Sequence, residues 1–277
     1  MVIVYMYYLT MTTTYRLAYS AILAILLLGL PYFAQASEDS VELIKLTHDN
    51  FVTIRGPINS ESASRVINEL LSNEERNIYV YINSNGGSVV SGGQIIQTIR
   101  ALQASGKTIN CIANTALSMG FAILQSCSTR LVLPSSVLMQ HQVSLGIDGN
   151  LRQVDNYLTF VKKMNDELDV MQSNRLGMTL QQFKELCEHD IWLYGSDALT
   201  YKAADRMVLA VCNFIPKTYE ETISTFFGDI VLKFSSCPLS TSPLKITFSN
   251  PTISKDDKDT VLQQIYKDYM ISSDYVV

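Results

Sequence analysis

The chain is poor in charged residues and has no excess of basic ones. Charged residues make up 17% of its 277 residues, whereas about 25% is usual for a soluble protein. Lysine and arginine number 21 against 26 aspartates and glutamates, which gives a formal charge of -5. A nucleic-acid-binding protein needs a basic balance or a basic stripe, and neither is present. We therefore expect no nucleic-acid partner.

Cysteine is also scarce. The five cysteines are too few for a disulfide scaffold, and they include no Cys-x-x-Cys pair and no cluster with histidine at zinc-ligand spacing. We expect neither a metal nor another cofactor. An odd number of cysteines leaves at least one thiol free or bonded to another chain, and the spacing reveals no pairing. Cys111, inside an apolar segment, is more typical of a core residue than of a reactive thiol.

Charge is scarcest at the N-terminus, where Arg16 is the only charged residue before Glu38. An apolar run over residues 21–30 follows Arg16, and a small-x-small sequence ends at Ala36. These features predict a signal peptide over residues 1–36 and therefore an exported protein, periplasmic or secreted. An uncleaved membrane anchor over residues 17–36 is the main alternative. A true start at Met11 and a buried helix are further alternatives.

From residue 51 onward, short β-rich apolar runs alternate with segments of helical periodicity. The expected strands lie at 51–55, 78–82, 107–113, 130–133 and 137–140. Five helices are expected. They lie at 62–75, with Ser60 or Ser62 as N-cap, around 95–102, from the Ser118 segment to about 126, and at 151–174, and the last begins after the N-cap Thr179. We expect the seven regularly spaced apolar residues from Leu151 to Met171 to face inward. The alternation predicts an α/β domain with parallel strands over residues 37–210.

Residues 211–277 follow this domain as a separate extension. They predict strands at 229–233 and 244–248 and a helix at 255–269. We expect an α+β extension, and the sequence assigns it no function.

Ser118 lies where a predicted strand passes into a predicted helix, flanked by Ala116 and Gly120. In parallel α/β sheets, active sites lie beyond the carboxyl ends of the strands. A serine there can act as a nucleophile, because free N–H groups at the helix start can hold an oxyanion. A simple N-cap serine is the common alternative.

The turn at residues 84–88 contains Gly86 and Gly87 directly after a buried strand. Its spacing matches neither a Walker A loop nor a GxGxxG motif, which argues against a phosphate site. It favours either a backbone oxyanion donor or an edge for peptide docking, with a plain tight turn as the alternative.

Two further residues complete a possible catalytic set. His141 ends a predicted strand, and Asp190 stands at the end of a predicted helix before an apolar run. Each also has a structural explanation: a hydrogen-bonded histidine and an exposed helix-terminal acid. A catalytic triad is recognised by the roles of its members, so the chain order Ser118, His141, Asp190 is acceptable.

Four ordered motifs resemble the Clp protease proteolytic subunit (ClpP) family. YINSNGGSV at 81–89 resembles the family's YINSPGG turn, and ALSMG at 116–120 resembles its AASMG nucleophile motif. LMQHQ at 138–142 is similar to its MIHQP segment, and EHDIWL at 188–193 to its ERDRFL segment. The segment from Gly146 to Gly149 and the helix that follows resemble the family's handle. The resemblance runs from about Leu43 to Val208.

This resemblance implies a ClpP/crotonase-like fold of repeated ββα-type units with a protruding handle, and serine endopeptidase activity on peptides or unfolded polypeptides. Ser118 would be the nucleophile, His141 the general base and acid, and Asp190 the residue that orients His141. The backbone N–H groups of Gly87 and Met119 would form the oxyanion hole. The substrate would lie as an extended strand against Gly86, Ser88 and Val89.

The resemblance also implies a homo-oligomeric heptameric ring, stacked in pairs through the handle. The family's ATP-dependent unfoldase partner is not expected here, because an exported protein has no ATP supply. Three residues depart from the family pattern: Asn85 replaces a proline, Leu117 replaces a small residue, and Lys202 replaces a glycine. A left-handed lysine would cost about 1–2 kcal/mol.

Three alternatives stand beside this prediction. A Ser-Lys membrane peptidase resembling signal peptide peptidase A shares the Gly-Gly-Ser-Val turn, but the histidine and aspartate segments favour the triad family. A non-catalytic ring scaffold of the same fold would not need the three triad residues. A crotonase-type acyl-CoA enzyme would have a similar oxyanion hole but would need no Ser-His-Asp set.

Overall fold

The computed structural model describes residues 41–144 and 146–269. The expected leader over residues 1–36 lies outside the described residues. The strands of the core are β1 (Glu42–Leu46), β2 (Phe51–Arg55), β3 (Asn77–Ser84), β4 (Thr108–Leu117), β5 (Thr129–Gln140), β6 (Ile191–Tyr194) and β7 (Arg206–Cys212). Its helices are α2 (Ser60–Ser72), α3 (Val89–Ala104), α4 (Met119–Ser126), α5 (Leu151–Leu176), α6 (Leu180–Cys187) and α7 (Asp197–Thr200).

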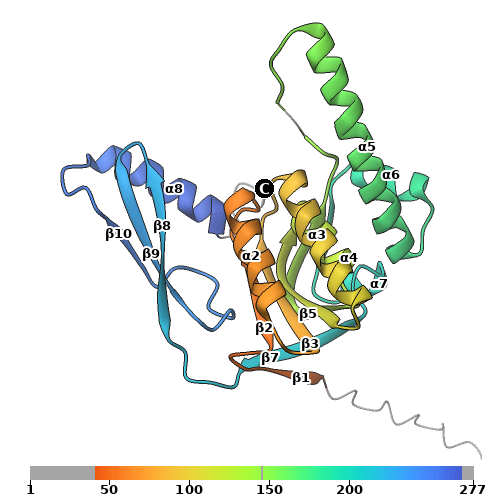
Figure 1. Cartoon of the computed structure of the whole chain (residues 1–277), viewed down its shortest axis with the longest axis horizontal. Coiled ribbons are helices and arrows are strands. Elements are labelled where there is room, and N and C mark those ends of the chain that lie inside the picture. Colours follow the sequence, from red (N-terminus) through yellow and green to blue (C-terminus); the bar gives the residue numbers. More distant parts are fainter. Residues whose placement is uncertain (1–40, 145, 270–277) are drawn as a thin grey trace, which may run out of the picture. The chain divides into compact units, whose positions relative to one another are not determined.

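These strands form one seven-stranded sheet in the order β1-β7-β5-β4-β3-β2 (Figure 1). The neighbours along this path pair in parallel, while β6 pairs antiparallel with β5. The helices cross between parallel strands, as such connections require. This mainly parallel sheet with crossover helices confirms the predicted α/β class.

The central strand β3 explains how the sheet is buried. Its residues 80–84 are all buried, as in a strand covered on both faces. Val80 and Ile82 belong to the large core beneath α2, α3 and α4, whereas Tyr81 belongs to a smaller cluster with Ile44 and Leu46. The burial of these apolar side chains on both sides holds the carboxyl end of β3 rigidly beside that of β4.

Helix α2 begins earlier than its sequence pattern predicts. Its N-cap is Asn59 rather than Ser60 or Ser62, because the Asn59 carboxamide accepts hydrogen bonds from the N–H groups of Glu61 and Ser62. The Ser62 hydroxyl accepts in turn from the Asn59 N–H at 3.0 Å. This reciprocal capping box uses asparagine, which caps helices as well as serine does.

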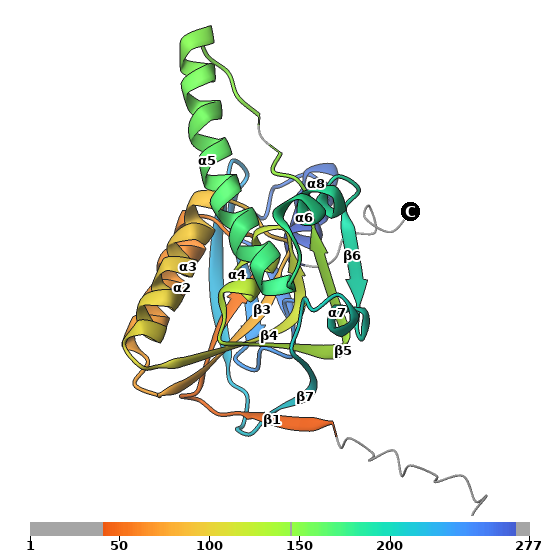
Figure 2. The same ribbon diagram turned by 90° about the vertical axis from the view of Figure 1, so that its right-hand side faces the viewer.

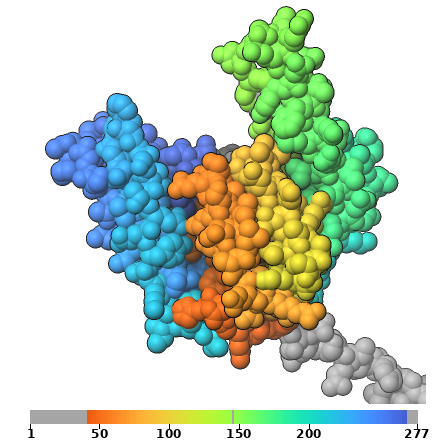
Figure 3. Space-filling view, viewed as in Figure 1, coloured from red at the N-terminus to blue at the C-terminus, as the bar shows by residue number. Residues whose placement is uncertain are grey.

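Helix α5 corrects the prediction of an inward-facing apolar stripe. Leu151 at its start is 90% exposed, and Tyr157 and Phe160 are also exposed, whereas Val161 and Leu176 are buried. The first half of the helix projects away from the body, and only its second half packs on the core (Figures 1, 2 and 3). Helical periodicity predicts which residues share a face, but a partner is needed to bury that face.

Strand β5 is one strand where the sequence predicts two. Its pairing with β4 shifts register between Ala113 and Thr115, and Pro134 and Ser135 lie at the shift. The buried Ser136 hydroxyl donates to the carbonyl of Ala113 and accepts from the N–H of Leu133. These two bonds satisfy backbone groups that the shift leaves unpaired, so the strand continues through it.

The extension forms a three-stranded antiparallel sheet of β8 (Thr218–Thr225), β9 (Gly228–Ser235) and β10 (Lys245–Phe248), with helix α8 (Lys255–Tyr269) packed on it. The predicted strands and helix are confirmed, and β8 is an additional strand. A disulfide between Cys212 and Cys237 joins the extension to β7. The buried Arg55 of β2 donates to the Tyr219 hydroxyl and lies 4.6 Å from the Phe234 ring centroid.

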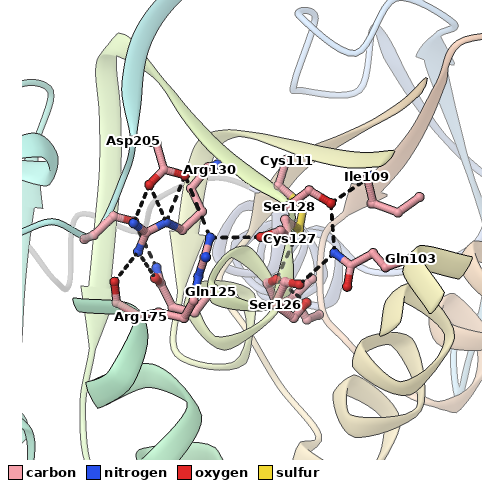
Figure 4. Close-up of a disulfide and its surroundings, with 12 residues drawn as sticks. Gln103, Ile109, Cys111, Gln125, Ser126, Cys127, Ser128, Arg130, Arg175 and Asp205 are labelled. Atoms are coloured by element: carbon pink, nitrogen blue, oxygen red, sulfur yellow. Dashed lines mark hydrogen bonds and ion pairs between the residues drawn. A yellow bond between two sulfur atoms is a disulfide. The ribbon is translucent and has the colours of Figure 1, made fainter. Parts of the chain in front are cut away.

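A second disulfide, Cys111–Cys127, joins β4 to the residue after α4 (Figure 4). Arg175 of α5 donates to the Cys127 carbonyl at 2.9 Å. Cys111 is buried, as expected, but it is bonded rather than free, and Cys187 is the free cysteine. Between residues 41 and 269, apart from residue 145, no helix is long and apolar enough to cross a bilayer.

A buried guanidinium lies beside this disulfide. Arg130 on β5 binds the Asp205 carboxylate through its side chain and through its own N–H, the latter at 2.7 Å. It also donates to the Gln125 side chain and to the carbonyl oxygen of Arg175 (Figure 4). A further hydrogen bond goes to the carbonyl oxygen of Lys202. Lys202 is left-handed, with φ 55°, and its bonded carbonyl helps to hold this unfavourable conformation.

Candidate active site

Ser118 and His141 are in direct contact. The Ser118 Oγ lies 2.8 Å from the His141 Nε2. Ser118 occupies the N-cap position of α4, but its side chain makes no capping hydrogen bond. Its hydroxyl therefore faces the imidazole and not the helix end, which removes the simple N-cap interpretation for this side chain.

The backbone at Ser118 is held in an unusual conformation. Its φ of 53° and ψ of -117° lie in a region that favours glycine. Such a residue costs on the order of 1–3 kcal/mol and persists only where its surroundings impose it. Here the Ser118 N–H donates to the Met139 carbonyl of β5 at 2.8 Å, and its carbonyl accepts from Ala122. The resulting sharp strand-to-helix turn presents the hydroxyl beside His141.

His141 follows the last residue of β5. Its N–H donates to the side chain of Gln140, at 3.1 Å, and the Gln140 amide in turn binds the buried Gln172 side chain of α5. Strand β5 and helix α5 thus determine the start of the His141 segment. The other two histidines lie elsewhere: the His48 ring lies 4.3 Å from the Phe214 ring, and His189 is exposed.

The Gly86-Gly87 turn packs directly against the Ser118 segment. A Cβ on Gly86 would lie 2.7 Å from both the Leu117 oxygen and the Ser118 Cβ. A Cβ on Gly87 would lie 2.3 Å from the Ile58 oxygen, and both glycines have positive φ. Ile58 holds the turn from the other side through two hydrogen bonds. Its N–H donates to the carbonyl of Gly86, and its carbonyl accepts from the N–H of Ser88. Any side chain at these two positions would overlap neighbouring atoms, which explains why both are glycine.

The proposed oxyanion donors come from these two packed segments. Among the described residues, neither the Gly87 N–H nor the Met119 N–H has a hydrogen-bond acceptor. Met119 is the first residue of α4, so its N–H belongs to the positive end of that helix. On the other segment, Ser88 and Val89 continue from Gly87 into α3, and the Ser88 hydroxyl caps that helix.

Asp190 is not brought to His141 in this conformation. It lies exposed in the turn between α6 and β6, with φ 49°. Within the described parts of the chain, no hydrogen bond or ion pair joins its carboxylate to the His141 ring. The structure therefore places two of the three triad candidates in contact and leaves the third apart.

A cavity of about 510 Å³ opens beside His141, and the sequence did not reveal it. Its walls come from the residues after β5, from α5 and from α6. Asp169 of α5 is 9% exposed on this wall, and burial raises the pKa of its carboxyl above the ordinary value. Cys187 also lines the cavity, and burial, with the charges of Asp169 and Asp190, raises the pKa of its thiol to about 12. The thiol is thus kept protonated and unreactive.

One sequence signal could have pointed to Asp169. It shares a face of α5 with Val161, Asn165 and Gln172, which recur at helical spacing and include buried residues. Its acidic character nevertheless suggests a solvent-facing position, so the sequence pattern alone does not identify it as buried. In the described part of the chain, no group of three or more His, Cys, Asp or Glu side chains could hold a metal ion.

Comparison with known proteins identifies the family of this chain. The family model described as Clp protease matches residues 35–210. A protein of Streptococcus suis (strain 98HAH33) named ATP-dependent Clp protease proteolytic subunit is 29% identical over 172 residues, which are 59% of this chain and 87% of that protein. Proteins with the same name from Streptococcus pyogenes serotype M1 and Streptococcus equi subsp. zooepidemicus (strain H70) have the same identity and coverage.

The matched region contains the whole seven-stranded sheet except the last residues of β7, and it contains Ser118, His141 and Asp190. It ends where the extension begins, so β8, β9, β10 and α8 are additions to the matched region. The chain belongs to the Clp protease family and is a serine-type peptidase with a ClpP/crotonase-like fold.

Proposed function

We propose that the chain is a serine endopeptidase that hydrolyses peptides or unfolded polypeptides, with Ser118 as nucleophile and His141 as general base and acid. The observation that supports this most directly is the 2.8 Å contact between the Ser118 Oγ and the His141 Nε2. The absence of a capping bond from Ser118 leaves the hydroxyl available for attack.

The chemistry proceeds in two stages. His141 takes the Ser118 proton as the Oγ attacks the substrate carbonyl, and the N–H groups of Gly87 and Met119 stabilise the oxyanion. His141 then gives its proton to the leaving amine, and a water molecule hydrolyses the acyl-enzyme with His141 again as base. The substrate lies extended along Gly86, Ser88 and Val89, so main-chain hydrogen bonds carry much of its recognition.

Asp190 completes the triad by orienting His141 in this proposal. Because no hydrogen bond joins its carboxylate to the ring in the described conformation, the proposal requires a change of conformation at Asp190 or His141 that brings them together. This separation is the one observation that favours the second candidate function, a non-catalytic scaffold of the same fold. A Ser-Lys mechanism has no comparable support, because the Ser118 Oγ contacts an imidazole.

Labelling with a fluorophosphonate tests the nucleophile. We expect labelling of Ser118 in the unmodified chain, none in Ser118→Ala, and a loss of at least a hundred-fold in rate in His141→Ala. Ser72→Ala, at an exposed serine of α2, is the matched control and should label normally. An unmodified, folded chain that does not label would favour the scaffold, and rapid labelling without His141 would exclude the proposed base.

We further propose that the chain forms a homo-oligomeric ring, with seven subunits and pairing through α5. The exposed Leu151, Tyr157 and Phe160 on the projecting half of α5 support a contact there. Native mass spectrometry tests the assembly: Phe160→Asp should separate paired rings, while Lys163→Asp, at an exposed neighbour, serves as control. A stable monomer of the unmodified chain would exclude the ring.

The compartment is proposed to be outside the cytosol, with residues 1–36 as a signal peptide or residues 17–36 as an anchor. The two disulfides support an oxidising environment. In such a compartment the chain would work without an ATP-dependent unfoldase, although the relatives' names include ATP dependence. Sequencing the N-terminus of protein from intact cells tests the leader, and a start at Met1 would exclude its cleavage.

A further inference from the structure

The cavity beside His141 has an apolar interior. Val161 and Cys187 on its wall are 9% and 5% exposed, and Leu158 and Val143 also line it. Its volume of about 510 Å³ is in the range of ligand pockets, about 300–1,000 Å³. His141 contributes to its wall and contacts Ser118, so a side chain next to the attacked carbonyl can enter it.

One charged side chain is buried on this wall. Asp169 is 9% exposed, whereas the other charged lining residues are less buried: Lys162, Asp166 and Glu188 are exposed, and Lys184 is half-buried. Lys184 is already paired with Asp166 at 2.8 Å, and both side chains are partly in solvent. The one buried charge on this otherwise apolar wall is therefore acidic, while the charges at the rim are of both signs and screened by water.

The Asp169 carboxylate has no ion-pair partner in direct contact among the described residues, although the Lys184 charge acts on it from farther away. Its Oδ2 accepts a hydrogen bond from the Asn165 amide at 2.8 Å, and no basic group of the described residues lies within ion-pair distance. Burying a carboxylate with so little compensation is costly. A cationic group inside the cavity would offset this cost, and an aliphatic stem would fill the apolar part.

We propose that this cavity holds the substrate side chain that precedes the scissile bond, and that Asp169 selects lysine or arginine at that position. This inference rests on the proposed peptidase function. The stem of the basic residue would pack on Leu158, Val161 and Cys187, and its charged end would bind the Asp169 carboxylate in a charge-assisted hydrogen bond.

Fluorogenic peptides that differ only in the residue before the scissile bond test this selectivity. For the unmodified chain we expect kcat/KM to be at least ten-fold higher with lysine or arginine than with leucine, and lowest with glutamate. In Asp169→Asn, the values for lysine and arginine should fall ten- to hundred-fold, while the value for leucine stays within about two-fold. Glu167→Gln, at an exposed acid of α5 that does not line this cavity, is the matched control and should change none of them more than two-fold.

A preference of the unmodified chain for leucine would overturn the inference, as would an equal fall for all substrates in a folded Asp169→Asn. If that variant does not fold, peptide aldehydes ending in lysinal or leucinal are compared on the unmodified chain, and lysinal should inhibit at least ten-fold more tightly. Fluorophosphonate labelling distinguishes a failure of the selectivity inference from a failure of the proposed peptidase function. Ser118 labelling with leucine preferred overturns the selectivity alone, whereas no labelling and no cleavage overturn the peptidase function and this inference together.

Discussion

The side-chain amide of Asn85 donates a hydrogen bond to the main-chain oxygen of Lys267 at 2.7 Å. Asn85 belongs to the glycine turn beside Ser118, and Lys267 belongs to the last turn of α8. Tyr269 adds a second contact, since a Cβ on Gly56 would lie 2.8 Å from its ring. Gly56 in turn accepts a hydrogen bond from Ser84, which begins the glycine turn. The extension thus touches the segment that carries a proposed oxyanion donor.

We expect Asn85→Ala to lower kcat/KM about five-fold. The variant removes a bond worth about 1 kcal/mol, and the turn then holds the Gly87 N–H less firmly. Peptide hydrolysis measures the effect, and the change should appear in kcat more than in KM. Asn73→Ala is the control, because Asn73 also donates from its side chain to a carbonyl, that of Asp49, far from the turn. An equal loss in both variants would contradict a specific role for Asn85.

We expect Ser118→Gly to be more stable than Ser118→Ala by about 1 kcal/mol. Both variants lack the nucleophile, but only glycine adopts a φ of 53° with a ψ of -117° without strain. Urea denaturation of the two inactive variants measures the difference in free energy of unfolding. Equal stability, or a more stable alanine variant, would show that the backbone there is unstrained.

We expect alkylation of the unfolded, unreduced chain to modify one cysteine, Cys187, and alkylation after reduction to modify all five. The disulfides Cys111–Cys127 and Cys212–Cys237 protect the other four. Intact mass before and after reduction counts the thiols. Replacing Cys212 and Cys237 with serine should cost roughly 3 kcal/mol, because the closed loop of about 25 residues loses its constraint. More than one reactive thiol without reduction would contradict this pairing.

We expect Asp205→Asn to lower the free energy of unfolding by about 2 kcal/mol at pH 7. A fully buried pair would lose about 3–5 kcal/mol, but Asp205 is 35% exposed, which reduces the effect. Burial alone would raise the pKa of Asp205, yet the Arg130 hydrogen bonds and charge, with Arg175, hold that pKa below its ordinary value. The carboxylate therefore stabilises the fold above the unfolded pKa, and this contribution is lost as the pH falls through the folded pKa.

Denaturation at pH 7 and pH 3 checks this prediction. The difference in free energy of unfolding between the unmodified chain and Asp205→Asn should be smaller at the lower pH. Glu69→Gln breaks the partly exposed Arg65–Glu69 pair, which joins neighbouring turns of one helix, and should change stability by no more than about 0.5 kcal/mol at either pH. A gap that is constant with pH would mean that the ionised carboxylate is not the source of the effect.

The contact between Ser118 and His141 could be predicted because both residues follow apolar strands. The ends of parallel neighbours meet at one edge of a sheet, and β4 and β5 are such neighbours. The glycines at 86 and 87 were equally informative, since close backbone approach excludes side chains. The resemblance supplied the roles, which strand positions alone could not assign.

Other features depend on distant partners that a linear pattern does not contain. The exposure of Leu151 reflects the absence of a packing partner for the first half of α5, and the burial of Asp169 reflects the packing of α6 against the second half. Cysteine pairing depends on which strands become neighbours. Strand β8, with Glu220 and Glu221 in its middle, shows little apolar alternation and was therefore missed.

Arg130 has a consequence for how the domain opens. Its side chain is 5% exposed, and its partners lie 5, 45, 72 and 75 residues away along the chain. A partial opening that detached α4, the base of α5 or the start of β7 would leave a buried cation short of acceptors. These segments are therefore coupled into one cooperative unit, and protection of their amides against hydrogen exchange should be lost together rather than segment by segment.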